Sequence, residues 1–358
     1  MSRLIRAVID TQALRANLRR LRTLALTAHV TAVVKANAYG HGLVPTALAL
    51  DAADSFGVAR IEEGIALRAA GIAQPIMLLE GVFTMEQIAE AARHAFELVV
   101  HDRLQIELLE KFTGTHQFVI WVKIDTGMNR LGFRTQDFPA ALARVMRLPT
   151  PPKEIRLLTH LARADERDAA TTPDQLQRFK SVTRSLSLAT SIANSAGILG
   201  WPSARGDWIR PGLALYGASP FAKESAASLG LAPVMTLETT VIATRRVTRG
   251  DRVGYGGTWC AERDTTVAIL AGGYGDGLPR ALSNGTPVLI NGQRAPLVGR
   301  VSMDMIAVNV GDAQDVRVGT RCVLWGEGLP VEEIAAHAGT IPYELLCGVN
   351  QRVPLEIR

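Results

Sequence analysis

The chain has 358 residues, of which 47% are apolar and 20% are charged, a composition typical of a globular protein with a large core. Its length exceeds the usual size of a single core, so we expect one large domain and a smaller one. The net charge of +5 is spread along the sequence and only 5% of the residues are aromatic, a pattern that argues against a nucleic-acid-binding surface.

Cysteine usage and the first residues predict where the protein works. The three cysteines, Cys260, Cys322 and Cys347, are far apart and form no C-x-x-C motif, so we expect no metal site and reduced thiols. The segment 1–21 interrupts its apolar residues with charges every few positions, which predicts neither a signal peptide nor a membrane span. We therefore expect a cytoplasmic protein.

The first two thirds of the chain alternate short apolar runs with segments of helical spacing. The expected strands are 31–35, 55–59, 75–80, 98–101, 118–125, 155–160, 191–195 and 207–212. Segments 61–71, 85–95 and 173–189 have helical spacing. Eight such units within about 220 residues predict a TIM-type (β/α)8 barrel, because alternating strands and helices form right-handed parallel units. An open doubly wound sheet is the alternative, but no glycine fingerprint follows the first strand.

After about residue 230 the pattern changes to short Val, Thr and Ile runs separated by glycine. The expected strands cover 236–247, 265–270, 287–298 and 320–326, with a tight hairpin at Asn291-Gly292. Only the segment 332–338 has helical spacing. We therefore predict a barrel over residues 1–230, whose first ten residues are free to join the second domain, and a mostly-β C-terminal domain over 231–358.

The segment AVVKANAYGHG (32–42) places Lys35 at the carboxyl end of the first barrel strand, where barrel enzymes hold their catalytic groups. An amine in apolar surroundings is a Schiff-base nucleophile of the kind that pyridoxal phosphate enzymes need. Tyr39 offers a phenol to a phosphate, and Gly40 and Gly42 allow close backbone approach. A strand-end lysine that only reaches solvent is the alternative interpretation.

The segment resembles the cofactor-lysine segment of the alanine racemase family, and later motifs resemble that family in the same order. They are KIDTGMNRLGF (123–133), THLARADE (159–166), ANSAG (193–197), IRPGLALYG (209–217), VGYGGTW (253–259), GYGDG (273–277) and GRVSMDM (299–305). The resemblance covers nearly the whole chain. It implies a pyridoxal-phosphate-dependent enzyme that interconverts L- and D-alanine.

The resemblance also implies how the cofactor is held. Lys35 matches the cofactor-binding lysine, and Tyr39 matches the tyrosine at the phosphate. The other matched phosphate-binding positions are Ser195, Gly212 and Leu213. Arg210 matches the arginine at the pyridine nitrogen; because arginine cannot accept that proton, it favours returning a proton to Cα over transamination. An arginine paired with an acid such as Asp207 is the plain structural alternative.

Racemisation needs a group on each face of Cα to take or deliver a proton. By resemblance, Lys35 serves the D-enantiomer and Tyr255 the L-enantiomer, and His160 couples Tyr255 to Arg210. In the family, Tyr255 comes from the partner subunit, so the resemblance implies a two-fold homodimer with composite sites. Met303 and Asp304 would come from the partner as well, with the Met303 backbone at the substrate carboxylate.

Four further positions carry expectations. Arg130 matches an arginine near the substrate carboxylate, and Lys123 matches a lysine that many members carry as a carbamate. Tyr274 matches a residue that narrows access to the site. Gln351 stands where some members have a tyrosine that reaches the phosphate and lines the inner gate. Glutamine can still donate a hydrogen bond but lacks the ring, so one phosphate contact and the exclusion of substrates larger than alanine stay open.

Several alternatives remain at the sequence level. Another small-amino-acid racemase of the same family would share these motifs. A decarboxylase of the same barrel type would be expected to place an acid, not Arg210, at the pyridine nitrogen. A non-catalytic pyridoxal phosphate carrier would lack the domain that supplies Tyr255. Supply of cell-wall precursors and breakdown of alanine use one kind of active site, so both roles stay open.

Overall fold

Eight short parallel strands close into a barrel in the computed structural model, which describes residues 4–313 and 315–358. In chain order they are β2 (His29–Val33), β3 (Ser55–Val58), β4 (Ile76–Leu78), β5 (Glu97–Val100), β6 (Val119–Asp125), β8 (Glu154–Leu158), β9 (Thr190–Ser191) and β10 (Trp208–Ile209). The pairing of β10 with β2 and of β5 with β6 closes the ring. The predicted TIM-type barrel is therefore confirmed.

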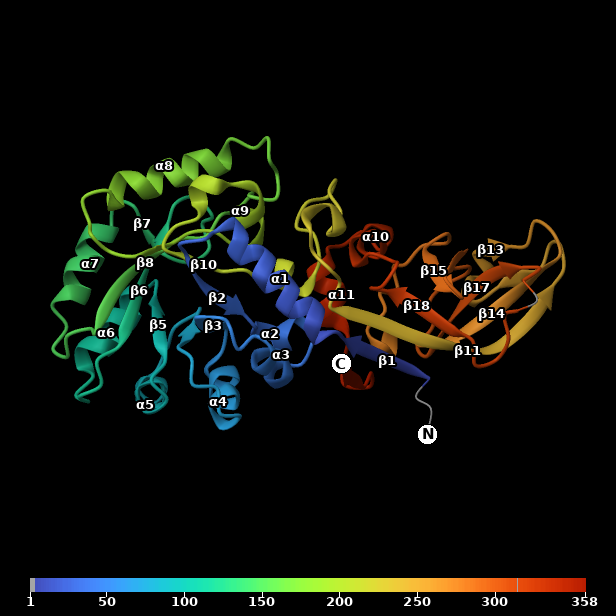
Figure 1. Ribbon diagram of the computed structural model, residues 1–358, viewed down its shortest axis with the longest axis horizontal. Coiled ribbons are helices and arrows are strands. Elements are labelled where there is room, and N and C mark those ends of the chain that lie inside the picture. Colours follow the sequence, from blue (N-terminus) through green and yellow to red (C-terminus); the bar gives the residue numbers. More distant parts are fainter. Residues whose placement is uncertain (1–3, 314) are drawn as a thin grey trace.

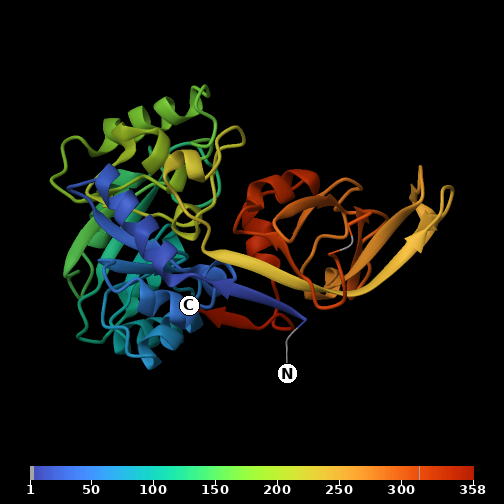
Figure 2. The same ribbon diagram turned by 45° about the vertical axis from the view of Figure 1, so that its right-hand side comes forward.

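Helices surround the barrel strands, as the alternating sequence predicts (Figures 1 and 2). They are α1 (Thr11–Leu24), α3 (Leu43–Ala49), α4 (Ile61–Ala69), α5 (Met85–Arg93), α6 (Arg103–Lys111), α7 (Phe138–Met146), α8 (Thr171–Thr183) and α9 (Ser195–Gly200). The longer ones, such as α1, α5 and α6, bury an apolar stripe and expose charged residues. Within residues 4–313 and 315–358, no helix has both the length and the apolar character to cross a membrane.

The barrel interior carries a layer of large side chains directly beneath the candidate site. Met77, Val99, Trp121, Leu158 and Trp208 form one buried cluster. Because side chains two positions apart share a strand face, these strands deliver Lys123, His160 and Arg210 to the next level up. The dense layer below therefore fixes the height and direction of those three side chains.

The layer is closed from below by a buried ion pair. The guanidinium of Arg156 lies 5.1 Å from the ring centroid of Trp121 and 4.6 Å from that of Trp208. Glu97 accepts a hydrogen bond of 2.7 Å from the Trp121 indole and lies 3.5 Å from Arg156. This arrangement keeps water out of the barrel and leaves the opposite, carboxyl-terminal mouth as the open end.

The rest of the chain forms a largely antiparallel sheet that extends away from the barrel (Figures 1 and 2). Its strands are β1 (Ile5–Ile9), β11 (Met235–Val247), β14 (Thr265–Ala271), β15 (Pro287–Ile290), β16 (Gln293–Pro296), β17 (Met305–Gly311), β18 (Arg321–Trp325) and β19 (Leu355–Ile357). β1 pairs antiparallel with β11 and parallel with β19. Asn291 and Gly292 have φ of 50° and 78° between β15 and β16, which confirms the predicted hairpin turn.

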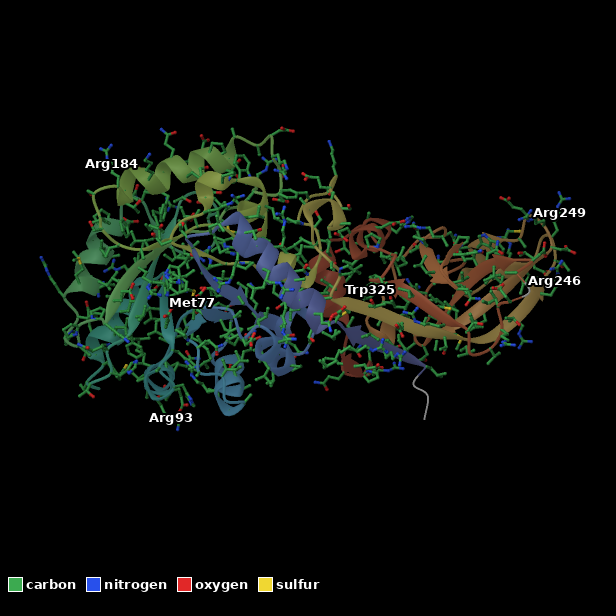
Figure 3. All side chains as sticks on the ribbon, in the orientation of Figure 1. Met77, Arg93, Arg184, Arg246, Arg249 and Trp325 are labelled. Carbon is green, nitrogen blue, oxygen red and sulfur yellow. The ribbon has the colours of Figure 1, made fainter. Side chains whose placement is uncertain are left out.

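Figure 3 draws the side chains as sticks and labels two apolar residues and several arginines. Met77 lies inside the barrel and Trp325 inside the second sheet, and both are fully buried. The labelled arginines, such as Arg93 and Arg246, project from the outer surface. One continuous buried apolar cluster runs from the barrel and its helices into the second sheet.

Three sequence expectations differ from the structure. A second helix follows α10 (Val331–His337): α11 (Pro342–Gly348) was not predicted, because its 7 residues are too few to show a clear helical period, although Pro at its start and Gly at its end are signals of helix boundaries. α8 ends at Thr183, six residues before the predicted 189. The segment 305–311, predicted as no strand, forms β17, which pairs antiparallel with β14 and buries Ile306 and Val308.

Candidate active site

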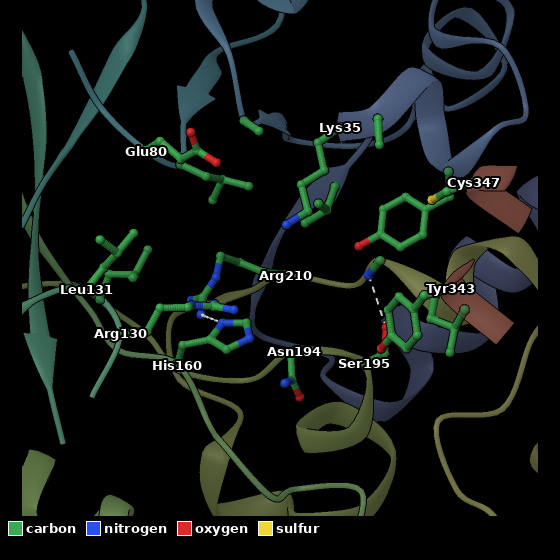
Figure 4. A pocket seen from close by; sticks show the side chains of 18 of the residues that line it. Lys35, Glu80, Arg130, Leu131, His160, Asn194, Ser195, Arg210, Tyr343 and Cys347 are labelled. Atoms are coloured by element: carbon green, nitrogen blue, oxygen red, sulfur yellow. Dashed lines mark hydrogen bonds between the residues drawn. The ribbon is translucent and has the colours of Figure 1, made fainter. Parts of the chain in front are cut away.

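A cavity of about 560 Å³ opens at the carboxyl ends of the barrel strands (Figure 4). Nine residues expected from the sequence line it: Lys35, Tyr39, Lys123, Arg130, His160, Ser195, Arg210, Gly212 and Leu213. They come from five different strand ends and their loops, up to 178 positions apart in the sequence (213 minus 35). This is the face on which barrel enzymes build their active sites.

Lys35 begins a left-handed turn, α2 (Lys35–Tyr39), instead of ending its strand. Ala36, Asn37, Ala38 and Tyr39 all have φ between 53° and 54°. Each non-glycine residue in this conformation costs roughly 1–2 kcal/mol, so neighbouring contacts must hold the turn. The turn directs the amine of Lys35 toward the side of the cavity where Arg130, His160 and Arg210 lie (Figure 4). It places Tyr39 against Gly212 and Tyr216.

Tyr39, Ser195 and Gly212 form a cradle of hydrogen-bonding groups. The backbone N–H groups of Gly212 and Ala214 donate to the Ser195 hydroxyl at 3.0 and 3.1 Å. A Cβ atom at position 212 would lie 2.4 Å from the Tyr39 hydroxyl oxygen, so only glycine allows this approach. The side chain of Tyr39 stacks on Tyr216 at 4.8 Å between ring centroids. The cradle offers hydroxyl and N–H donors suited to a phosphate.

Arg210 is buried and is held entirely by neutral groups. It donates to the Ser191 hydroxyl at 2.5 Å and to the Thr159 carbonyl at 2.6 Å, and it lies 3.5 Å from Nδ1 of His160. In the described residues no carboxylate forms an ion pair with it, and burial alone lowers its pKa. The proposed acid partner Asp207 instead accepts hydrogen bonds from Thr190. Arg210 is thus a fixed cation that cannot take a proton at neutral pH.

Positive charge dominates the cavity. Burial, and then the charge of Arg130, lower the pKa of Lys35, although Glu80 and Glu63 oppose this. Burial and the cations Arg210 and Arg130 lower the pKa of Lys123 to about 8. Burial and the same neighbours hold the pKa of His160 well below its ordinary value, so this imidazole is neutral at physiological pH. The site therefore suits an anionic ligand, and it favours the neutral, nucleophilic form of the Lys35 amine more than water does.

Four expected site residues lie outside this cavity. Tyr255 is 71% exposed and stands just before β13 (Trp259–Cys260), at the end of the second sheet that is remote from the barrel (Figure 1). Tyr274 and Met303 are also exposed, and their loops are joined by the N–H of Gly275, which donates to the Met303 carbonyl at 2.9 Å. Asp304 accepts from Arg352 at 2.7 Å.

Gln351 is exposed in the turn after α11 and does not line the cavity, so it makes no contact there in place of the tyrosine of other members. Tyr343 on α11 lines it instead, with its ring 5.9 Å from that of Tyr39. Burial raises the pKa of Tyr343 to about 12, so its phenol stays protonated as a donor. Tyr343 therefore adds an aromatic ring and a hydroxyl donor to this wall of the cavity.

Sequence reasoning also missed Ile341 and Cys347, which line the cavity beside Tyr343. Tyr343 and Cys347 are four positions apart, the spacing that places two side chains on one face of a helix. This spacing is the signal that would have identified α11 as a wall of the cavity, had the helix been predicted. Other lining residues without an expected role are Glu80, Leu131 and Asn194.

Comparison with known proteins identifies the family. Residues 9–220 match the family profile described as "Alanine racemase, N-terminal domain", and residues 234–357 match "Alanine racemase, C-terminal domain". The chain is 51% identical over 348 residues to the alanine racemase of Nitrosococcus oceani, which covers 97% of this chain and 98% of that protein.

Solved structures agree with the sequence comparison. The biosynthetic alanine racemase of Pseudomonas aeruginosa superposes with a TM-score of 0.97 at 43% identity, covering 100% of both chains. The alanine racemase of Bartonella henselae with covalently bound pyridoxal phosphate superposes with a TM-score of 0.89 at 32% identity, also over 100% of both chains. The chain belongs to the alanine racemase family.

Proposed function

We propose that this protein interconverts L- and D-alanine with pyridoxal phosphate as cofactor. The observation that carries the proposal is the pairing, in one cavity, of an amine with a lowered pKa at Lys35 and a buried arginine, Arg210, which has no acid partner in the described part of the chain. A decarboxylase of this barrel type would be expected to place a carboxylate where Arg210 lies. When bound, pyridoxal phosphate withdraws electrons from Cα and makes its proton acidic.

The residues of the cavity fit this cofactor. Lys35 supplies the amine that would bind its aldehyde, and Tyr39, Ser195, Gly212 and Leu213 would hold its phosphate. The collision that a Cβ at Gly212 would cause with the Tyr39 hydroxyl supports this assignment, because it shows that the cradle leaves room only for the bare backbone. Arg210 would face the pyridine nitrogen and, as a cation, leave it unprotonated.

Two groups would move protons at Cα from opposite faces. Lys35 would serve the D-enantiomer, and Tyr255 of the partner subunit would serve the L-enantiomer. Neutral His160, whose Nδ1 lies 3.5 Å from the Arg210 guanidinium, would accept a hydrogen bond from Arg210. Its other ring nitrogen would donate a hydrogen bond to the hydroxyl of the partner subunit's Tyr255. Arg130 would bind the substrate carboxylate together with the backbone of Met303 of the partner subunit.

We propose that the active form is a homodimer with composite sites. Tyr255, Tyr274, Met303 and Met305 are between 41% and 71% exposed in the single chain. Exposed apolar groups gathered on one domain are typical of interaction surfaces. The division into residues 1–230 and 231–358 would then place the second domain of one protomer over the barrel mouth of its partner, with Tyr274 and Asp304 near the entrance.

Incubation with L-alanine and pyridoxal phosphate in heavy water tests the reaction. We expect loss of optical activity together with deuterium at Cα, because each proton removed exchanges with the solvent before it returns. Chirality and Cα deuteration are measured over time, with a sample without pyridoxal phosphate as the control. A yellow protein that leaves alanine in the L-form and undeuterated would contradict the proposal. Parallel runs with L-serine would show whether a larger side chain is accepted.

We propose that Lys123 carries carbon dioxide as a carbamate. Its pKa of about 8 leaves about a tenth of the amine neutral at pH 7, which is the form that reacts with carbon dioxide. The resulting negative charge would offset Arg130 and Arg210. With ¹³C-bicarbonate, we expect one carbamate signal in the ¹³C NMR spectrum, present in the exposed-site control Lys153→Ala and absent in Lys123→Ala. A spectrum without that signal, or one unchanged by Lys123→Ala, would refute the assignment.

We also propose a cytoplasmic location. The structure contains three free cysteines, Cys260, Cys322 and Cys347, and no disulfide bond among the residues it describes. Free thiols are typical of proteins kept in a reducing compartment.

A further inference from the structure

A buried histidine lies beneath the left-handed turn that carries Lys35 and Tyr39. His41 is fully buried, and its Nδ1 lies 3.0 Å from the carbonyl oxygen of Ala38 and 2.9 Å from that of Tyr39. Its ring lies 4.5 Å from the ring of Tyr216, on which Tyr39 also stacks. The imidazole therefore touches both the backbone of the turn and the aromatic support of Tyr39.

The surroundings of His41 fix its protonation. Two carbonyl oxygens face Nδ1, so Nδ1 must carry the hydrogen and donate it. Nε2 has no hydrogen-bond partner among the residues that the structure describes. Burial lowers the pKa of His41 to about 4, so the ring is neutral at physiological pH. A phenylalanine at this position would fill the same space without burying the unpaired Nε2. The advantage of histidine here is therefore its Nδ1–H group, which donates to the two carbonyl oxygens.

The other end of the turn is held as well. Glu63 on α4 accepts hydrogen bonds from the N–H groups of Ala36 at 2.7 Å and Ala59 at 2.9 Å. The side chain of Asn37 accepts from the N–H of Leu43 at 2.8 Å. His41 supplies the only side-chain donor to the carbonyls of Ala38 and Tyr39 within the described part of the chain. Removing it would release that end of a turn whose conformation is unfavourable by itself.

We propose that His41 is a positioning residue: by donating to the carbonyls of Ala38 and Tyr39, it holds the left-handed turn that sets the Tyr39 hydroxyl against Gly212 in the phosphate cradle. This inference rests on the proposed function, because the cradle matters only if the cavity binds pyridoxal phosphate. His41 itself does not line the cavity, so it acts through Tyr39.

Two substitutions separate the donor from the ring. His41→Phe keeps a buried ring against Tyr216 but removes the donor, whereas His41→Asn removes the ring and keeps a donor at the place of Nδ1. The dissociation constant of pyridoxal phosphate is measured by fluorescence titration of each apo-protein. We expect about a tenfold increase for His41→Phe, the scale of one lost hydrogen bond, and a smaller increase for His41→Asn.

Repeating the His41→Phe substitution in a Tyr39→Phe protein tests whether His41 influences cofactor binding through the Tyr39 hydroxyl. In Tyr39→Phe protein the hydroxyl is already absent, so His41→Phe should change the dissociation constant by less than about twofold. Val145→Ala, a cavity-forming change on α7, serves as the stability control. It should lower Tm without changing the dissociation constant.

Each other outcome overturns the inference. A His41→Phe protein with wild-type affinity, an equal loss in both Tyr39 backgrounds, or a His41→Asn protein no better than His41→Phe would each show a merely structural histidine. A wild-type apo-protein that does not bind pyridoxal phosphate would remove the proposed function and this inference together. If the wild-type apo-protein binds pyridoxal phosphate and His41→Phe does not change the dissociation constant, the proposed function stands and only the role of His41 is refuted.

Discussion

Replacing Lys35 with alanine is expected to lower kcat/KM for both alanine enantiomers by at least about 10⁴-fold, because one substitution removes the cofactor anchor and a proton-transfer group. In the wild-type chain, borohydride should reduce the bond between Lys35 and pyridoxal phosphate and so attach the cofactor permanently. The Lys35→Ala chain should carry no such attached cofactor. The measurement is peptide mapping after reduction, alongside racemisation rates in both directions.

Lys123 provides a demanding control for that experiment, since it is the other lysine that lines the cavity. Its pKa is lowered to about 8, so its amine is also reactive enough to be labelled if the aldehyde reaches it. We expect Lys35→Ala protein to remain unlabelled at Lys123. Labelling at Lys123 with activity retained would mean that the cofactor lysine has been assigned to the wrong strand.

The barrel could be predicted because its sequence signals lie within short segments and recur in each strand–helix unit. Runs such as FVIWVKID are buried on both faces and rich in β-branched residues, and the helical segments between them keep an apolar stripe. The strands β9 and β10 are only two residues long, far shorter than the predicted segments, because the chain there turns early to place Ser195 and Gly212 in the cavity.

The turn at Lys35 could not be predicted, because local preference opposes it. Four consecutive residues other than glycine adopt positive φ, which the sequence ANAY by itself does not favour. Contacts from Glu63 and His41 hold it, and Glu63 is brought there by a helix 24 positions beyond Tyr39 (63 minus 39). Only the folded chain reveals these contacts.

The resemblance to the family named nine residues that the structure brings into one cavity, but it did not name the C-terminal wall of that cavity. The position it singled out in this segment, Gln351, is exposed after α11. Tyr343 reaches the cavity from the first turn of that helix and adds an aromatic ring to its wall. Short helices without clear periodicity are where matching by motif alone is least secure.

Substitution of Tyr255 is expected to cause the second large loss of activity, and this loss tests whether the active site is shared between two subunits. Tyr255→Phe removes only the hydroxyl of an exposed side chain, so stability should hardly change. We expect the rate of proton removal from L-alanine to fall by about 10²–10⁴-fold, the usual contribution of one acid–base group. Binding of pyridoxal phosphate should stay close to that of the wild type, because Tyr255 does not line the cavity of its own chain.

Mixing two inactive variants shows whether the Tyr255 that acts in a cavity comes from the same chain or from the partner chain. When Lys35→Ala and Tyr255→Phe chains are unfolded and refolded together in equal amounts, about half of the dimers should contain one chain of each kind. If Tyr255 acts on the partner's cavity, each mixed dimer has one site with both Lys35 and Tyr255, and activity should return to roughly a quarter of wild type per chain. If Tyr255 acts within its own chain, no site in any dimer is complete and the mixture stays inactive. Recovery of activity, measured against each variant refolded alone, would therefore establish both the dimer and the direction in which the tyrosine is shared.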